Sequence, residues 1–395
     1  MNYLLDRACN NCVITNIKTK KRDIALFALL VIPFFYPPFL GTFDSLEFAY
    51  NVFYYLRFFS LLCCSILFVL NIRHIYFTNV NFFILVFAFY LLLVTAISRG
   101  DLKTALSFVS QCFVIFVCFS LFFRTLDKRV AAVNTMYYYL LALTIIDIIV
   151  LLFVKDANLS ILGPKNNHVY YLLPLLFFGI YKSYADNKSK YKLICMFAVV
   201  IDCVLEFSVT TIFSVSFFFL MYCLVALSKR ARISIKLIFC ISLVISLSLA
   251  FLSESVLKNI LNDVVGFFGK SDTFGRFEIW NAAAKLIKEK PLFGYGIESS
   301  EIVRMHFNDL NHAHNRYLDV LYMGGIVGLV MFMIPIVSLN TRALKEKSIL
   351  YILLVSYAIL YITEGKRIDA GFVAVLLTID LIATEKRNTT YVREI

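Results

Sequence analysis

Long apolar segments recur along almost the whole chain and are separated by short polar connections. Each has roughly 16 to 25 residues, and a helix of that length crosses a hydrocarbon core about 30 Å thick. The twelve segments are 24–43, 50–70, 82–98, 104–123, 130–154, 168–183, 193–209, 211–228, 235–253, 317–339, 348–363 and 370–384. The pattern predicts an all-α, polytopic integral membrane helical bundle of about twelve transmembrane helices, forming a single transmembrane domain over 1–395.

Two local features affect how these segments are divided. The stretch 193–228 contains no strong break, and we divide it at Thr210-Thr211 because the basic loops on both sides require two crossings. Pro37-Pro38 should kink the first segment, since proline removes a backbone donor and clashes with the preceding turn.

Composition and charge support a membrane protein and argue against a soluble one. Hydrophobic residues make up 61% of the chain and charged residues 16%, with a mean hydropathy of +0.80. A typical globular domain carries about 25% charged residues. The net charge of +12 would suggest a nucleic-acid partner in a soluble protein. Here the placement of the basic residues explains the charge without one.

Basic residues alternate between the two sides that the segments define. With the N-terminus inside, the cytoplasmic side collects 23 Lys and Arg residues, and the short loops on the other side hold 6. This bias predicts that both termini are cytoplasmic. The external six are Arg99, Lys103, Lys155, Lys165, Lys366 and Arg367.

The longest polar interruption is 254–316, between the ninth and tenth segments, and the orientation places it outside the cytoplasm. Two stretches within it, 254–268 and 277–290, have apolar residues at helical spacing and are predicted to be interfacial amphipathic helices. Trp280 is expected at the membrane–water boundary. Ser271 or Asp272 is the expected cap of the second helix, and Pro291 its end. Ordered loops of this length are usually functional.

Metal and disulfide chemistry receive little support. Most of the ten cysteines lie inside apolar segments, where they act as small hydrophobic residues. Cys9-Asn10-Asn11-Cys12 lacks the second pair that structural zinc requires. We therefore predict no metal site and no cofactor.

His312 and His314, flanked by Asn311 and Asn315, are the strongest catalytic candidates. A neutral imidazole with an ordinary pKa near 6.5 is suited to accept a proton from a hydroxyl group. The alternative is that each histidine caps the tenth helix or hydrogen-bonds the loop. An H-x-H pair needs further ligands to hold a metal, and no known spacing supplies them.

The same loop and two other external loops carry charged and polar candidates. Arg276, Arg304 and Arg316 could grip phosphate oxygens, and a helix N-terminus would add positive charge; a solvated face or a lipid headgroup contact is the alternative. Glu364, Lys366 and Arg367 form a dense cluster between two apolar helices, which is typical of a polar cavity but also of simple loop solvation. Lys165 and Asn166 form a further polar patch after the Gly163-Pro164 turn.

Several charged residues fall inside predicted spans, where an unpaired charge is costly, and three of them need an explanation. They are Arg57, Asp202 and Glu206. A buried ion pair with Arg57 and a proton or cation relay are the two interpretations. Asp147 and Asp380 are explained by nearby polar ends or helix packing.

Four ordered motifs between residues 275 and 329 resemble the signature region of the O-antigen ligase and Wzy-type polysaccharide polymerase superfamily. They are Gly275-Arg276 with Trp280, Pro291-Leu292-Phe293-Gly294-Tyr295-Gly296, His312-Ala313-His314-Asn315, and Gly325-Ile326-Val327-Gly328. Gly163-Pro164-Lys165-Asn166-Asn167 also resembles a polar motif of capsular and exopolysaccharide polymerases.

The resemblance implies a GT-C-like membrane glycosyltransferase in the bacterial cytoplasmic membrane, acting at its outer face without a metal. The donor would be an oligosaccharide linked to undecaprenyl diphosphate, with His314 as the base and Arg276 as a diphosphate contact. Membrane lipids and assembly proteins such as a flippase and a chain-length regulator would be partners, and nucleic acid would not. Many relatives place an arginine after a serine at the outer end of the seventh span, whereas this chain has Ser208-Val209-Thr210-Thr211. Lys366 or Arg367 would then substitute, or the diphosphate is held differently.

The motifs leave three functions open. Polymerase and ligase share nearly all of them, and the Lys165-Asn166-Asn167 patch favours a polymerase. A flippase or transporter is also compatible with twelve spans and intramembrane charges. A transporter has less reason to concentrate His, Arg and Gly in one external loop.

Overall fold

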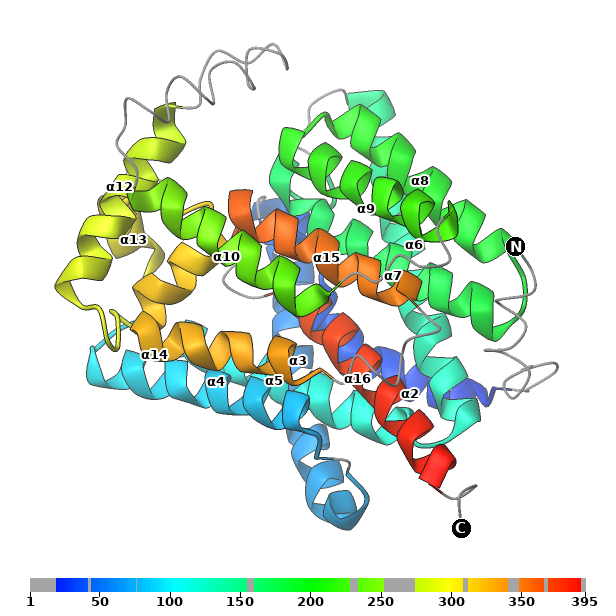
Figure 1. Ribbon diagram of the computed structural model, residues 1–395. Coiled ribbons are helices and arrows are strands. Elements are labelled where there is room, and N and C mark those ends of the chain that lie inside the picture. The colour runs from blue at the N-terminus through cyan, green and yellow to red at the C-terminus, as the bar shows by residue number, and fades with distance from the viewer. Residues whose placement is uncertain are drawn as a thin grey trace.

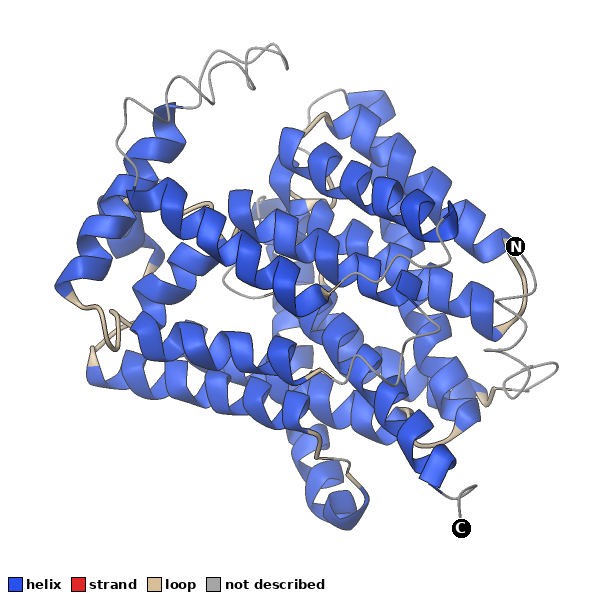
Figure 2. Ribbon diagram, in the orientation of Figure 1, coloured by secondary structure: helices blue, strands red, loops and turns tan. Residues whose placement is uncertain are grey.

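The computed structural model describes residues 19–41, 44–75, 77–154, 160–227, 234–251, 274–307, 312–339, 348–365 and 369–391. Within these ranges all regular secondary structure is helical (Figure 2). The α-helices are α2 (Lys21–Val31), α3 (Glu47–Asn71), α4 (Asn79–Ile97), α5 (Leu102–Phe122), α6 (Leu126–Val154), α7 (Val169–Ala185), α8 (Lys190–Glu206), α9 (Val209–Leu227), α10 (Ile235–Phe251), α12 (Phe274–Glu289), α13 (Ser300–His306), α14 (Arg316–Ser338), α15 (Ser348–Thr363) and α16 (Ala370–Tyr391).

Every predicted apolar segment overlaps one of these helices. Five helical segments are long and apolar enough to cross a membrane by themselves, and shorter apolar helices accompany them. The five are Glu47–His74, Asn79–Ile97, Leu102–Phe122, Leu126–Val154 and Arg316–Ser338. The chain is therefore a helical membrane protein.

Two predicted breaks occur close to their expected positions. The long apolar stretch divides at Phe207, which adopts left-handed backbone angles (φ 51°, ψ 47°) and ends α8. Helix α9 then starts at Val209, two residues after that break. The first segment breaks slightly before its expected kink: α2 ends at Val31 and short 3₁₀ turns follow, because Pro33 already interrupts the helical hydrogen bonds.

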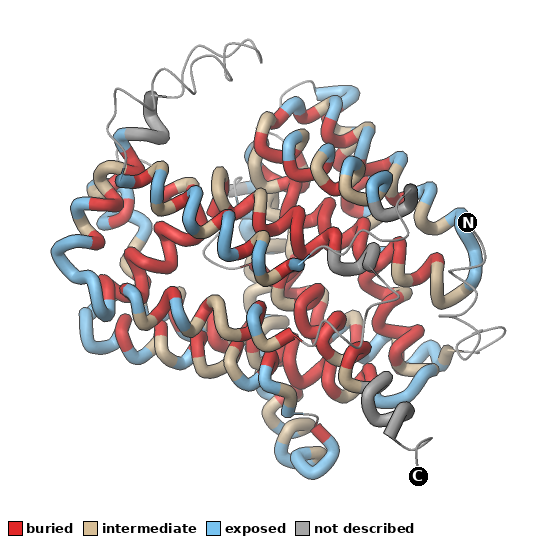
Figure 3. Tube along the Cα trace, viewed as in Figure 1, coloured by how far each residue is buried: buried red, intermediate tan, exposed pale blue. Residues whose placement is uncertain are grey.

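The helices are arranged around α7, which is buried along nearly its whole length. It packs against α6, α8, α15 and α16, while α14 lies along α4, and α15 lies between α9 and α10. Helices α12 and α13 lie at one end of this set, at the left of Figure 1. Buried residues run through the middle of the helical set, and exposed residues lie on its outer faces (Figure 3).

Helix α14 is broken at Gly325, whose backbone (φ 62°, ψ −163°) lies in a region that essentially only glycine occupies. A break in a membrane helix frees backbone groups that must find other partners. The segment Pro291–Gly296 runs along the break and satisfies them, and Tyr90 of α4 donates to the last freed carbonyl. The bonds are Tyr295 N to Tyr322 O (2.9 Å), Gly296 N to Met323 O (2.8 Å), Ile326 N to Pro291 O (2.8 Å), Val327 N to Leu292 O (3.2 Å) and Tyr90 Oη to Gly324 O (2.6 Å).

The loop before α14 contains one of its two expected amphipathic helices. Helix α12 matches the prediction for 277–290, whereas 254–268, Ser271 and Asp272 lie outside the described residues. Trp280, which was expected at the membrane–water boundary, is 4% exposed and packs within the protein rather than on its surface. It donates a hydrogen bond from Nε1 to the carbonyl oxygen of Ala313 (2.9 Å). The indole therefore holds the histidine segment in place.

Candidate functional site

His314 faces a carboxylate that lies far away in the sequence. Its Nδ1 is 3.1 Å from both Oε1 and Oε2 of Glu364, which follows directly on the C-terminal end of α15. Glu364 is 2% exposed, and the side chain of His314 is 17% exposed. A buried carboxylate thus orients an imidazole that is partly exposed on the surface of the protein.

This geometry assigns the basic nitrogen of His314. Because an ionised carboxylate only accepts hydrogen bonds, Nδ1 carries the proton and donates it to Glu364. The lone pair of the neutral ring is then on Nε2, which faces away from the carboxylate. A carboxylate behind a histidine fixes its tautomer and stabilises the imidazolium that forms when Nε2 takes a proton.

His312 lies beside His314, with the two ring centroids 4.1 Å apart. Nδ1 of His312 accepts a hydrogen bond from the backbone N–H of His314 (3.1 Å). In the neutral ring its proton is therefore on Nε2, which lies 3.4 Å from Oε1 of Glu364. Glu364 thus contacts both histidines and fixes the orientation of both rings.

Asn166 and Ser208 connect Glu364 to the helices behind it. The side-chain amide of Asn166 donates from Nδ2 to Oε2 of Glu364 (2.7 Å) and accepts at Oδ1 from Oγ of Ser208 (2.8 Å). Asn166 belongs to the short turn Lys165–Asn167 before α7, and Ser208 lies between α8 and α9. The role of Ser208 was missed, although the departure from the family pattern at Ser208–Thr211 marked this position.

The His312–His314 segment is fixed by contacts on both sides. Ala313 receives the hydrogen bond of Trp280, and its N–H donates to Oδ1 of Asp319 (2.8 Å). Asn315 is fully buried and caps α14, because its Oδ1 accepts from the backbone of Tyr317 and Leu318. His314 itself has φ 48°, in the left-handed region that non-glycine residues rarely adopt. The surrounding contacts hold this backbone, and its angles direct the imidazole toward Glu364.

The candidate cations fall into three groups. Arg304 is exposed on α13. Arg276 lies in the first turn of α12 and Lys165 in the turn before α7, but their side chains are outside the described part of the structure, as are Lys366 and Arg367 entirely. Arg316 is buried, with 4% exposure. The predictions that these residues contact substrate therefore stay predictions.

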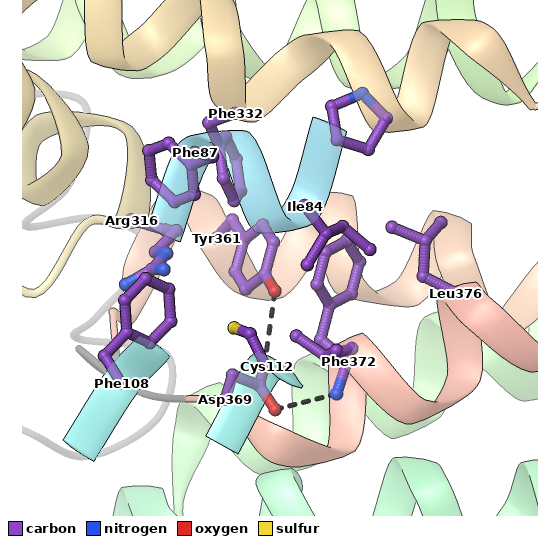
Figure 4. A pocket seen from close by; sticks show the side chains of 12 residues that line it. Ile84, Phe87, Phe108, Cys112, Arg316, Phe332, Tyr361, Asp369, Phe372 and Leu376 are labelled. Carbon is purple, nitrogen blue, oxygen red and sulfur yellow. Dashed lines mark hydrogen bonds between the residues drawn. The ribbon is translucent and has the colours of Figure 1, made fainter. Parts of the chain in front are cut away.

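Arg316 lines a small internal cavity between α4, α5, α14, α15 and α16 (Figure 4). The cavity has a volume of about 30 Å³ and is mostly apolar, with Asp369 as the other charged side chain in its wall. Asp369 accepts hydrogen bonds from Tyr361 Oη (3.3 Å) and from the backbone N–H of Phe372 (2.8 Å). A space of this size holds water but not a sugar, so Arg316 acts from within the protein in this conformation.

His312, His314 and Glu364 lie close enough together to raise the question of a metal ion. The donor set does not fit one, because Nδ1 of His312 already accepts a backbone N–H and Nε2 therefore carries the proton. A metal ligand nitrogen needs a free lone pair.

The expected ion pair between Arg57 and the carboxylates of α8 is wrong. Arg57 donates from Nε to the carbonyl oxygen of Pro33 (3.0 Å) and lies over the ring of Tyr36 at 4.2 Å. Asp202 instead pairs with His168 (2.8 Å), a contact that the sequence analysis missed. The only signal for it was the polar patch at the start of α7.

Residues 194–333 match the family model described as O-antigen ligase. The matched region runs from α8 to α14 and contains Trp280, the Pro291–Gly296 segment, both histidines and Gly325. The match confirms the superfamily that the motifs indicated, whose members are glycosyltransferase-like membrane enzymes. The function is accordingly of the O-antigen ligase or polymerase type. A search of curated proteins finds no match to the chain.

We expect Trp280→Phe to loosen the histidine segment. Phenylalanine keeps most of the buried ring but leaves the carbonyl of Ala313 without its donor, and an unsatisfied buried group costs about 1–3 kcal/mol. The purified variant should melt at a lower temperature than the wild type. Cells that express the variant should make less polymer. An unchanged melting temperature together with wild-type polymer would show that the indole only fills space.

Proposed function

We propose that this protein is a Wzy-type polysaccharide polymerase. It transfers a glycan from undecaprenyl diphosphate to the end of another lipid-linked repeat unit, at the outer face of the bacterial cytoplasmic membrane. The single observation that carries the proposal is the His314–Glu364 pair, with Nδ1 3.1 Å from both carboxylate oxygens. His314 lies within the region that matches the family model, whereas Glu364 follows α15, outside that region.

In the proposed reaction His314 is the general base. Nε2 takes the proton from an acceptor hydroxyl as that oxygen attacks the anomeric carbon of the donor sugar. The bond from the anomeric carbon to phosphate breaks, and undecaprenyl diphosphate leaves with the bonding electrons. Glu364 stabilises the imidazolium that results, since its buried carboxylate lies against Nδ1.

The leaving diphosphate requires positive charge. Arg304 is exposed on α13 beside the site loop, and Arg276 starts α12, where a helix N-terminus adds partial positive charge. We assign these two, with Lys165, Lys366 and Arg367, to the diphosphate and its glycan. Asn315 and Arg316 are buried, and we assign them to holding the start of α14 rather than to direct contact. No metal or cofactor is required by this scheme.

Contacts among the helix ends support twelve crossings with both termini in the cytoplasm. The contacting positions are Asn166 before α7, Ser208 between α8 and α9, His314 before α14 and Glu364 after α15. The proposed topology places all four at the outer face. The proposed topology places Asp101, between α4 and α5, at the same face. Its backbone N–H donates to the carbonyl of Ile297 in the long loop (2.6 Å), as this placement requires.

A ligase that moves the glycan to lipid A-core or another surface acceptor is the second candidate, favoured by the description of the matching family. The contact of Asn166 with Glu364 supports a polymerase instead, because the motif that resembles polymerases then belongs to the site. A flippase is less well supported, since transport does not require an oriented base.

Deletion of the gene, followed by analysis of surface glycan length, tests the proposal. Loss of long chains with single repeat units retained on the surface supports a polymerase. Polymer that accumulates on the lipid carrier would support the ligase instead. Repeat units trapped in the cytoplasmic leaflet would indicate a flippase, and unchanged glycan would contradict all three.

Glu364→Gln should lower activity strongly while leaving the fold intact. Glutamine has nearly the same shape and can still accept from His314, but it cannot stabilise the imidazolium by charge. We expect a fall of about 10²-fold or more in transfer rate. The readout is polymer length in a complemented deletion strain, with membrane levels of the variant measured in parallel. Wild-type chain lengths at equal protein level would remove Glu364 from the reaction.

A further inference from the structure

A second cluster of titratable side chains lies behind the candidate site, and the proposed transfer reaction does not use it. It consists of Asp147 on α6, His168 at the start of α7, and Asp202 and Glu206 on α8, and we call it the carboxylate–imidazole cluster. The exposed fraction is 0% for the first three and 1% for Glu206. Because His168 follows Asn166 by two residues, the cluster and the site share one loop.

Hydrogen bonds indicate which ring nitrogen of His168 carries the proton and which carries the lone pair. Nε2 lies 2.7 Å from Oγ of Ser160 and 3.2 Å from the carbonyl oxygen of Gly163. A carbonyl oxygen only accepts, so Nε2 carries a proton. Nδ1 lies 2.8 Å from Oδ1 of Asp202 and 3.4 Å from Oδ2 of Asp147. In the neutral ring the lone pair is therefore on Nδ1, which shares a proton with Oδ1 of Asp202 and also faces Asp147.

The cluster also contains three buried carboxyl groups against one imidazole. Four of its carboxylate oxygens have no hydrogen-bond partner: Asp147 Oδ2, Asp202 Oδ2, and both oxygens of Glu206. Among the side chains that the structure describes, His168 is the only basic group paired with either aspartate. Unsatisfied buried carboxylates carry a large desolvation penalty. Further positive charge between these oxygens would remove it.

We propose that the carboxylate–imidazole cluster is a structural binding site for a divalent cation of the zinc type. Nδ1 of His168 and one oxygen each of Asp147 and Asp202 are the ligands, and these three atoms lie within 4.8 Å of one another. Glu206, one helical turn from Asp202, supplies the remaining negative charge. Imidazole combined with carboxylates is a donor set that suits zinc.

Two details of the geometry fit a cation, which would replace the 2.8 Å hydrogen bond between Nδ1 and Asp202. The separation of 3.4 Å between Nδ1 and Oδ2 of Asp147 makes no hydrogen bond, as this oxygen has no partner. It matches the edge of a tetrahedron with metal–ligand bonds of about 2.1 Å, which is about 3.4 Å. The Nε2–H of His168 is held by a backbone carbonyl, the arrangement that commonly orients metal-binding histidines.

Binding has a defined proton balance and a structural consequence. Loading the site replaces the proton that Nδ1 and Asp202 share, so one proton leaves for each cation bound. The cation would join the ends of α6, α7 and α8 and fix the turn that carries Asn166. Full burial excludes substrate from the site, so its role is structural. The histidine pair near Glu364 differs, because Nδ1 of His312 accepts a backbone N–H and the Nε2 that faces the carboxylate then carries the proton.

The test is the metal content of the full-length protein purified in detergent from zinc-supplemented cells, measured by mass spectrometry. We expect about one equivalent of zinc in the wild type and a loss of at least tenfold in Asp202→Asn and His168→Gln. His314→Ala should retain the metal although polymer is lost, so this result does not depend on the proposed function. His306→Gln is a matched control for loss of a histidine outside the cluster.

A second measurement covers the case in which the cluster variants do not accumulate. Wild-type protein treated with a chelator is titrated with Co²⁺, and tetrahedral coordination by nitrogen and oxygen should give visible absorption bands together with a higher melting temperature. Less than a tenth of an equivalent of zinc in the wild type, with no Co²⁺ bands, would overturn the proposal and leave a protonated network. Metal retained at wild-type level in both cluster variants would overturn it equally.

Discussion

His314→Ala should abolish long-chain polymer while the protein remains in the membrane at a normal level. Alanine removes the nitrogen that takes the acceptor proton, and loss of a general base typically lowers a rate by about 10²–10⁴-fold. The side chain is partly exposed, and its removal opens no cavity in the buried core. The measurement is glycan length in a deletion strain that expresses the variant, alongside immunoblotting of its membrane fraction.

The matched control is His74→Ala. His74 is an exposed histidine after α3, on the side that the topology assigns to the cytoplasm. The same chemical change there should leave chain length unaltered. If His314→Ala gave wild-type chains, or if both variants lost polymer equally, His314 would not be the base.

Gly325→Ala should prevent accumulation of folded protein. Its backbone angles are nearly restricted to glycine, and a Cβ there would lie 2.3 Å from the carbonyl carbon and oxygen of Leu292. Backbone atoms cannot move away as a flexible side chain would. The break in α14 and its pairing with Pro291–Gly296 would both be lost, at a cost of about 3 kcal/mol or more. Melting temperature and membrane yield are the measurements.

Gly328→Ala is the control within the same motif. Its backbone is helical, and the nearest atom to an added Cβ is Cε1 of Tyr90 at 3.2 Å, the end of a side chain that can shift. We expect near-normal yield and melting temperature for this variant. Similar losses in both glycine variants would mean that the motif is needed for helix packing alone, and that the break in α14 is not the reason for Gly325.

Periodicity and composition predicted the helices because the bilayer imposes a simple rule on the chain. Backbone groups in hydrocarbon must be satisfied within the segment, so each apolar run of sufficient length becomes a helix. Even the weak division of 193–228 was found within a few residues, at Phe207. The local pattern did not predict the environment of Trp280. Its burial depends on a hydrogen bond to Ala313, a partner that no local pattern reveals.

The candidate site could be predicted only in its parts. The motifs singled out His314, Glu364 and Asn166 one by one, but from three different loops. His314 and Glu364 are 50 residues apart, and Asn166 and Glu364 are 198 residues apart. No spacing rule connects positions so distant, since their contact depends on how α7, α14 and α15 pack.

The sequence by itself determined that this is a helical membrane protein, which superfamily it resembles, and which loop holds His312 and His314. Only the tertiary structure decided that Glu364 orients His314, that Pro291–Gly296 completes a broken α14, and that Asp202 faces His168 rather than Arg57. The physical reason is the range of the interactions involved. Burial in a membrane acts on each segment separately, whereas hydrogen bonds between buried polar groups depend on which helix ends meet.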